Sequence, residues 1–128
     1  MSQAAYALRL LVGYVLGVAI ETVILAVGLS SRHGLRRRLF AGVWLTSCTY
    51  PVVVWVLPFF IDAARSRSAY LFAAETFAPA AECLLFWAVF DRGQGYARAI
   101  VARDCGAIIV ANLASFGVGE CLNRWGWG

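Results

Sequence analysis

Charged side chains are scarce in this sequence. Only 14% of its 128 residues are charged, the basic ones are all arginines, and 62% of the chain is hydrophobic. A soluble domain of this size usually has about a quarter of its residues charged and about half apolar. The apolar excess here is gathered into long runs, which is typical of membrane-spanning helices. The composition therefore argues against a water-soluble protein and leaves little sequence for a separate soluble domain.

Sequence motifs for metal binding and for common hydrolytic chemistry are also missing. The four cysteines form no CxxC pair, which argues against a zinc ribbon or a thioredoxin-type redox site. His33 is the only histidine, so there is no HExxH zinc-protease motif, and no GxSxG nucleophile elbow occurs. From the sequence we predict no metal ion and no cofactor, and no residue can be assigned as catalytic.

Four apolar segments are present, each long enough to cross a bilayer. A hydrocarbon core about 30 Å thick needs roughly 20 helical residues. We predict spans over residues 6–29, 39–61, 69–90 and 104–125, and the helical pattern of the last can be extended back to about Tyr96. The first run is too long for a cleaved signal peptide and is interrupted by Glu21, so we expect it to remain in the mature protein. The predicted fold is an all-α integral membrane protein, with residues 1–128 forming one four-helix transmembrane domain.

The arginines are distributed unevenly between the two ends of these spans. The end that carries the first and third loops has seven arginines, whereas the opposite end has four, Arg9, Arg65, Arg67 and Arg124. By the positive-inside rule we expect a multi-pass protein of the inner membrane, with loops 30–38 and 91–103 in the cytoplasm and both termini outside. This topology already explains the RRR cluster at residues 36–38. We therefore predict no nucleic-acid partner, and the lipid bilayer is the first expected partner.

Glu21, Glu75, Glu82 and Glu120 lie inside the predicted spans. A charged side chain at mid-membrane costs at least about 2.5–3.5 kcal/mol on insertion scales. We therefore expect all four to face other helices rather than lipid. Glu75 and Glu82 are seven residues apart, which predicts that they share one helix face. Pro79 between them has no N–H, so the carbonyl of Glu75 loses its usual helical hydrogen bond.

Small and polar residues accompany the glutamates. Gly13, Gly17 and Glu21 are spaced by four, so a neighbouring helix can approach closely beside Glu21. Hydroxyl and amide side chains occur at similar depth on the other helices, and hydrogen bonding between helices explains them at least as well as ligand binding does. The predicted ligand- or proton-binding residues are Glu21, Glu75, Glu82, Glu120, Thr49, Tyr50, Asn112 and Ser115.

Two stretches of the sequence resemble each other. RLFAGVWLTSCTYP, from Arg38, and RDCGAIIVANLASFG, from Arg103, each begin with arginine and later carry a polar pair, an aromatic residue and a helix breaker. The preceding helices share AIET, at residues 19–22, and AAET, at residues 73–76. The pattern favours two helical hairpins related by a parallel repeat, with a site at their interface, although apolar helices also resemble each other by composition alone.

The sequence is compatible with three kinds of function. A non-catalytic subunit of a membrane complex is favoured, because the chain is short and its small-residue stripes suit association with copies of itself or with a partner membrane protein. A proton- or cation-coupled small transporter using Glu21 and Glu82 is the alternative, because intramembrane carboxylates often mark ion pathways. An intramembrane enzyme acting on a lipid-soluble substrate is least favoured, since only the carboxylates support it.

One resemblance to a known family accompanies the transporter alternative. In its size, its four spans and the glutamate of AIETVIL in the first helix, the chain is similar to the small multidrug-resistance transporters. The resemblance stops at Glu21 and its neighbours. The glutamates in the third and fourth helices depart from the pattern of that family.

Overall fold

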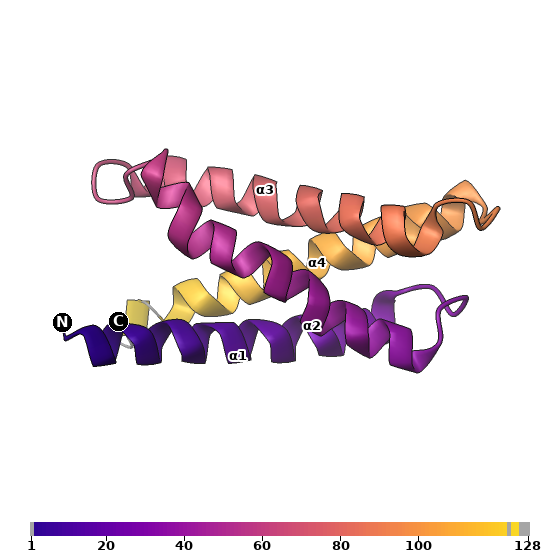
Figure 1. Ribbon diagram of the computed structural model, residues 1–128, viewed down its shortest axis with the longest axis horizontal. Coiled ribbons are helices and arrows are strands. Elements are labelled where there is room, and N and C mark those ends of the chain that lie inside the picture. The colour runs from indigo at the N-terminus through magenta and orange to yellow at the C-terminus, as the bar shows by residue number, and fades with distance from the viewer. Residues whose placement is uncertain (1, 123, 126–128) are drawn as a thin grey trace.

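The computed structural model describes residues 2–122 and 124–125, and the regular elements among them are helices (Figure 1). α1 spans Gln3–Gly28, α2 spans Leu35–Pro51, α3 spans Arg67–Phe86 and α4 spans Arg98–Leu122. α2 continues through the π-helical η1, Val52–Val56, into the 3₁₀ turn η2, Leu57–Phe59, and α3 continues through the π-helical η3, Trp87–Asp91. The four resulting rods are each long and apolar enough to cross a membrane.

The ends and irregularities of the helices follow from local sequence. The Ser2 hydroxyl accepts a hydrogen bond from the N–H of Ala5 at 3.1 Å, so it caps the N-terminus of α1. Ser66 caps α3 in the same way through Ala69. Pro51 has no N–H to donate, and the chain passes from α-helical to π-helical geometry directly after it. The second rod therefore widens directly after its proline.

The predicted spans correspond to these four rods, with one clear difference at the start of the last. α4 begins at Arg98, before the predicted span at residue 104 and close to Tyr96, to which the helical pattern extends. Hydrophobicity marks only the part of a helix that suits lipid, whereas the segment between Arg98 and Asp104, which has an arginine at positions 98 and 103, continues the same helix. Residue 123, inside the predicted span, lies outside the described residues. The all-helical prediction is confirmed, and the chain forms four helices of membrane-spanning length.

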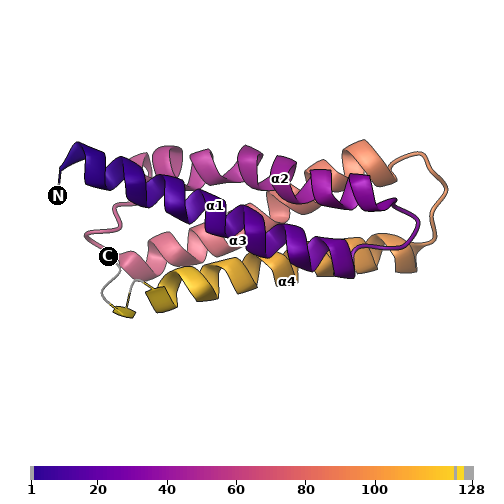
Figure 2. The same cartoon turned by 90° about the horizontal axis from the view of Figure 1, so that it is seen from below.

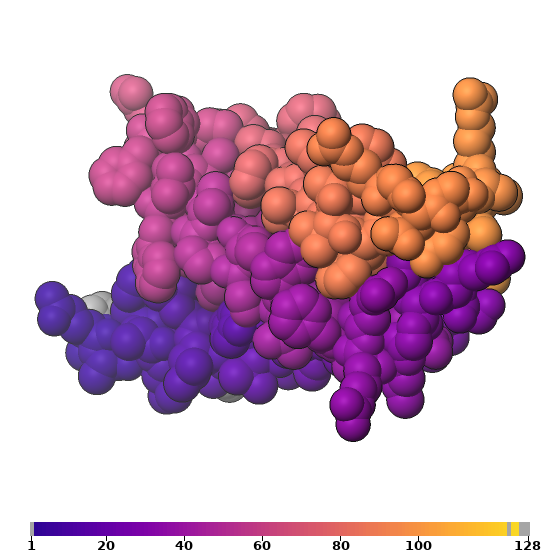
Figure 3. Space-filling view, turned by 45° about the vertical axis from the view of Figure 1, so that its right-hand side comes forward, coloured from indigo at the N-terminus to yellow at the C-terminus, as the bar shows by residue number. Residues whose placement is uncertain are grey.

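The four rods run alternately up and down (Figures 1 and 2). The start of α1, the end of α4 and the connection 60–66 lie at one end, which we call the terminal end. The turns 29–34 and 92–97 lie at the other, which we call the turn end. α1 packs against α2 and α4, and α3 packs against the same two helices. Figure 3 shows the orange surface that follows α3 adjoining the purple surface at the start of α2, so the two turns meet at a common end.

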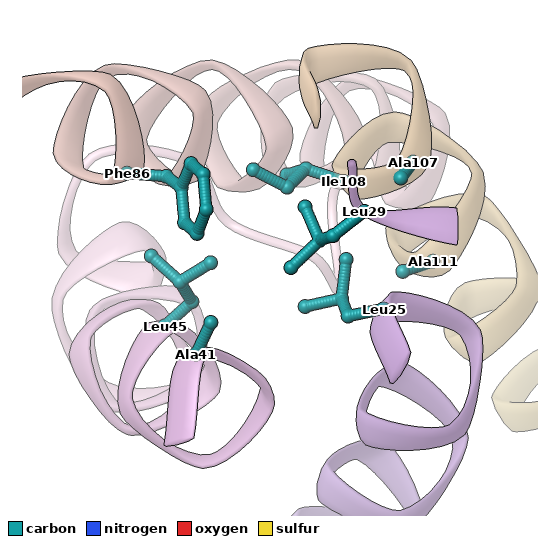
Figure 4. Close-up of a cluster of buried hydrophobic side chains, with 8 residues drawn as sticks. All are labelled: Leu25, Leu29, Ala41, Leu45, Phe86, Ala107, Ile108 and Ala111. Atoms are coloured by element: carbon teal, nitrogen blue, oxygen red, sulfur yellow. The ribbon is translucent and has the colours of Figure 1, made fainter. Parts of the chain in front are cut away.

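The apolar core lies toward the turn end of the bundle. Figure 4 shows Leu25 of α1, Leu45 of α2, Phe86 of α3 and Ile108 of α4 pointing toward one another. Each of these residues is at most 1% exposed. Leu29, Ala41, Ala107 and Ala111 complete the same buried cluster. The packed core therefore holds the turn end together, whereas a cleft opens toward the terminal end of the bundle.

α1 and α2 approach each other closely along the predicted small-residue stripe. A Cβ atom at Gly42 would lie only 2.6 Å from Thr22 Cα, and one at Gly13 would lie 2.9 Å from Tyr50 Oη. Neither position has room for a larger side chain unless its neighbour moves. The lack of side chains at these positions brings the hydroxyl groups of α2 up against the face of α1 that carries Glu21.

Candidate functional site

Glu21 of α1 and Glu82 of α3 meet in the interior of the bundle. They are 4% and 1% exposed, and their carboxyl groups are close enough to influence each other electrostatically. The sequence predicted that both face other helices, and the structure places them so. Two neighbouring carboxyl groups in an apolar interior do not both ionise without a compensating charge, so one of them keeps a proton. The pair is therefore a natural place to hold or release a proton.

The other two helices supply the polar partners of this pair. Thr46 of α2 and Ser115 of α4 donate to the Glu21 carboxyl, and Thr49 of α2 donates to that of Glu82. Asn112 of α4 lies near Glu82, and its amide nitrogen donates to the carbonyl of Ile108 at 2.9 Å. All four rods thus contribute to one polar cluster. Of its members, Thr46 alone was not among the residues predicted from the sequence.

The three hydroxyl groups of the cluster each have two acceptors within reach and only one proton. One acceptor is a carboxyl oxygen of the pair and the other is a backbone carbonyl oxygen. The two distances are 2.5 and 2.9 Å for Thr46, 2.9 and 3.1 Å for Thr49, and 3.1 and 3.1 Å for Ser115. A hydroxyl can donate to a carboxylate, or turn to the backbone and accept from a carboxylic acid. The cluster can therefore stay hydrogen-bonded in more than one protonation state.

A cleft of about 460 Å³ connects this cluster with the terminal end of the bundle. Tyr6 and Tyr70 line it near the terminal end, and Glu21 lines it at depth. Most of the remaining wall is apolar, with the polar residues Thr46, Thr49, Asn112 and Ser115 around Glu21. Among the described residues, Glu21 lines the cleft and Glu82 does not. One carboxyl of the pair therefore faces the cleft, while the other lies behind it.

The mouth of the cleft carries charged and phenolic groups. Arg67 forms an ion pair with Glu120 at 2.5 Å, and both side chains are partly exposed. The Tyr50 hydroxyl donates to the carbonyl of Leu10, and the Tyr70 hydroxyl donates to the carbonyl of Val53, each at 2.8 Å. Tyr50 and Glu120, both predicted site residues, thus line the cleft without touching the carboxyl pair. Glu120 is satisfied by an arginine instead.

Glu75 does not join the cluster, contrary to the expectation that every intramembrane glutamate faces another helix. Its side chain is exposed, whereas Ala74, Ala78 and Glu82 are buried. The buried face of α3 thus follows residues four apart. Helices that cross at an angle bury such a row, and the row turns away from residues seven apart along the helix. At the level of Glu75 the inward face has passed to Ala74.

The polar pair in each half of the proposed repeat reaches the central cluster. Of the two matched glutamates, only one does. Glu21 of AIET is buried in the cluster, whereas Glu75 of AAET is exposed on the outside of α3. The partner of Glu21 is Glu82, which has no counterpart in the first half of the pattern. The similarity of the two halves in sequence therefore does not extend to their carboxyl groups.

A second polar cluster lies at the turn end, and the sequence did not predict it. His33 lies in the turn after α1, Asp91 ends η3 and Asp104 lies in α4, and all three are buried. The His33 Nε2 atom is 2.9 Å from Asp104 Oδ2 and 3.0 Å from Asp91 Oδ1. Three separate segments supply these residues, so no short motif marks them. The available signal was a lone histidine on the same side of the helices as the two aspartates.

Comparisons with known proteins do not indicate a function for this chain. No family model, curated protein or solved structure matches the chain. The similarity to small multidrug-resistance transporters therefore has no support beyond Glu21 and the four helices. Function has to be argued from the geometry of the sites rather than from the fold.

Proposed function

We propose that the chain is a multi-pass protein of the inner membrane, with its turn end in the cytoplasm and both termini outside. Four rods of membrane-spanning length support this placement. Large apolar side chains also cover the outside of the bundle, among them Val23, Phe72, Leu84 and Val110, which are each more than half exposed. Lipid is the solvent that suits such a surface. The excess of arginine at the turn end supports the orientation.

Within this membrane we propose that the protein binds and transports small organic cations in exchange for protons. The observation that carries the proposal is the cleft that leads from the terminal end to Glu21, with Glu82 directly behind it. Its volume of about 460 Å³ lies within the range of roughly 300–1,000 Å³ that is usual for small-molecule sites. The sequence alone favoured a complex subunit. The cleft changes that preference, because a purely structural subunit has no need of an open path to a buried carboxyl pair.

Chemistry favours an organic cation as the ligand. Tyrosine rings and aliphatic side chains line most of the cleft, so a hydrated inorganic ion would be poorly matched, whereas an aromatic cation can stack on the rings. Two adjacent carboxyl groups in an apolar surrounding do not both ionise without a compensating charge. An arriving cation supplies that charge, so it competes with a proton for the pair. The hydroxyl groups of Thr46, Thr49 and Ser115 can reorient as the proton leaves.

Binding of benzyltrimethylammonium to the detergent-purified protein tests this proposal. The probe is aromatic and permanently charged, so any proton released on binding comes from the protein. We expect Glu21→Gln to weaken binding by at least about 30-fold, because loss of one partner of a buried charge pair costs about 2 kcal/mol or more. Glu75→Gln is the matched control, since the same change on the exposed face of α3 should leave the affinity unaltered. Calorimetry in two buffers of different ionisation enthalpy measures both the affinity and the protons released.

Equal affinities for the wild-type protein and Glu21→Gln would contradict the proposal, as would binding without proton release. Unaltered helical circular dichroism of each variant shows that a loss of binding is not a loss of fold. A neutral analogue in which carbon replaces the ammonium nitrogen should bind weakly to all three proteins. If it binds as tightly as the cation, the cleft recognises shape rather than charge.

The complex-subunit function has one observation in its favour, the exposed Glu75. This carboxyl group lies well inside the third rod, next to the exposed side chain of Thr76 and near that of Phe72. A carboxyl group facing lipid at such a position is costly, and contact with a helix of another chain would satisfy it. We therefore propose that this face of α3 mediates association in the membrane, with a second copy as the simplest partner.

Substituting leucine for Glu75 tests whether a second copy of the chain covers this face of α3. If a second copy covers Glu75, we expect Glu75→Leu to weaken dimerisation by about 5- to 30-fold, the equivalent of one hydrogen bond between membrane helices. Glu75→Gln should keep most of the association, because an amide still forms hydrogen bonds. Förster transfer between labelled copies, diluted with lipid, measures the equilibrium. Unchanged transfer in Glu75→Leu would show that this face does not join two copies.

A further inference from the structure

The cluster at the turn end has the composition and spacing of a metal site. His33, Asp91 and Asp104 are at most 4% exposed, and one ligand atom from each lies within 4.8 Å of the other two. The cluster lies opposite the mouth of the cleft and takes no part in the proposed transport. The three residues come from the first turn, the end of η3 and the start of α4. A single bound ion would therefore join three segments that are distant in the sequence.

Asp91 is the residue that lacks a partner. Both of its carboxyl oxygens are buried without a hydrogen bond from any described residue. Oδ1 lies 3.0 Å from His33 Nε2, but the geometry does not form a directed hydrogen bond, because Nε2 carries at most one proton and its hydrogen-bond partner is Asp104 Oδ2. A buried carboxylate without a partner is costly, and native structures rarely keep one. Asp91 therefore lies against His33 while neither of its carboxyl oxygens accepts a hydrogen bond from a described residue.

Asp104, in contrast, is held in place from outside the cluster. Its Oδ1 atom accepts a hydrogen bond from the N–H of Ser30 at 2.8 Å, which leaves Oδ2 directed at His33. Such outer hydrogen bonds usually orient the ligands of a metal ion. The rings of Phe86 and Tyr96 lie 5.0 and 5.7 Å from the His33 ring, both nearly perpendicular to it. The imidazole is thus fully buried and held between aromatic rings.

We propose that His33, Asp91 and Asp104 bind one divalent transition-metal ion, with Zn²⁺ as the reference ion. Nitrogen and oxygen ligands together suit zinc and its first-row neighbours. In a tetrahedral zinc site with bonds of about 2.0 Å, adjacent ligand atoms lie about 3.3 Å apart. The present separations of 2.9 and 3.0 Å from Nε2 need only a small expansion to reach that value. Two carboxylates also neutralise the ion, and a fourth position is left for water or another ligand.

One neighbour opposes metal binding and gives the proposal a distinctive consequence. Arg37 Nη1 lies 3.4 Å from His33 Nδ1 and can donate to it only while Nδ1 has no proton. A metal ion on Nε2 places the ring proton on Nδ1, so the guanidinium has to turn away. Arg37 is exposed and already lies over the Phe90 ring, 5.2 Å from its centroid. It can therefore move aside, and its removal should tighten metal binding.

Zinc and cobalt titrations of the chelator-treated, detergent-purified protein test this proposal. We expect one Zn²⁺ per chain in the wild-type protein. In Asp91→Asn we expect an affinity loss larger than the roughly 10- to 100-fold that outer-shell partners of a metal ligand contribute. Asp91 is the variant of choice because it forms no hydrogen bond that the fold would lose. The metal-free Asp91→Asn protein should melt at the same temperature as the metal-free wild type or higher. Asp62→Asn, at the opposite end of the bundle, should bind Zn²⁺ as the wild type does.

Cobalt separates this site from adventitious binding by cysteine. The chain has four free cysteines, and the Cys83 thiol lies 3.6 Å from the carbonyl of Cys105. A Co²⁺ complex with nitrogen and oxygen ligands has visible d–d bands but lacks the intense near-ultraviolet charge transfer of a thiolate. We expect d–d bands without thiolate charge transfer. We also expect Arg37→Gln to bind the metal ion several-fold more tightly than the wild-type protein does. Thiolate bands, or equal affinities in the wild type and Asp91→Asn, would overturn the proposal.

Discussion

Substitution of Gly42 by alanine is expected to lower the free energy of unfolding by about 1–3 kcal/mol, the usual cost of overpacking. A Cβ atom at this position would lie 2.6 Å from Thr22 Cα and 2.8 Å from Thr22 Cβ, and would also collide with the Thr22 hydroxyl. Backbone atoms of α1 cannot rotate away as a long side chain can. The two helices would have to separate, which would also pull Thr46 away from Glu21.

Gly106 and Gly117 of α4 provide matched controls for Gly42. An added Cβ atom would have no neighbour within 4 Å at either position. Alanine should there stabilise the helix by roughly 0.5–1 kcal/mol, because glycine loses more backbone freedom on folding. Unfolding in mixed micelles with increasing dodecyl sulfate measures all three variants. The same sign of effect at Gly42 and Gly117 would show that α1 and α2 are not packed as described.

The overall fold could be predicted because its main determinants are local. Four apolar runs separated by short polar loops leave few arrangements other than four antiparallel rods. The spacing of Gly13, Gly17 and Glu21 also indicated which face of α1 would meet a neighbouring helix. The start of α4 was better indicated by the helical pattern, which extends back to about Tyr96, than by hydrophobicity, which placed the span from residue 104, since the helix begins at Arg98. Helices can extend beyond the lipid without any signal of that kind.

The central site was only partly predictable, because its geometry depends on how the helices cross. Depth along the helices could be estimated from sequence position. This brought Glu82, Thr49, Tyr50, Asn112 and Ser115 to a similar level, with Glu21 nearer the first and third loops. The direction of each side chain around the bundle could not be estimated. Glu75 was expected beside Glu82 on one face, but the crossing angle of α3 buries Ala74 and Ala78 instead. The α3 crossing is set by the packing of all four rods.

The turn-end cluster was missed for a different reason. His33 is surrounded in the sequence by arginines, which suggested an exposed basic loop. In the structure its imidazole is fully buried against Phe86 and Asp104. Burial of a turn depends on the neighbouring turn folding over it, and neither sequence carries that information alone. A lone histidine and two aspartates on the same side of a predicted membrane protein are the pattern to look for.

Glu82→Gln is expected to separate cation binding from proton exchange. Glu82 does not line the cleft, so an entering cation contacts Glu21 rather than Glu82. Glu82 is then a second group that can carry the exchanged proton. The glutamine amide can donate a hydrogen bond to the Glu21 carboxylate. This hydrogen bond favours the ionised form of Glu21. The variant should therefore still bind benzyltrimethylammonium. The affinity of the variant for the cation should hardly depend on pH. In the wild-type protein the proton and the cation compete, and coupling of this kind typically changes affinity by about 5- to 150-fold.

Proteoliposomes show whether this coupling drives transport. With the wild-type protein, an outward cation gradient should acidify the lumen, because protons enter in exchange for the cation that leaves, and an internal pH dye reports this change. With Glu82→Gln the proton signal should fall to the level of empty liposomes while cation binding persists. With Glu21→Gln both should be lost, because the group that faces the cleft is gone. Proton movement that survives in Glu82→Gln would mean that Glu21 alone exchanges cation for proton, and that the second carboxyl is only a hydrogen-bond partner within the bundle.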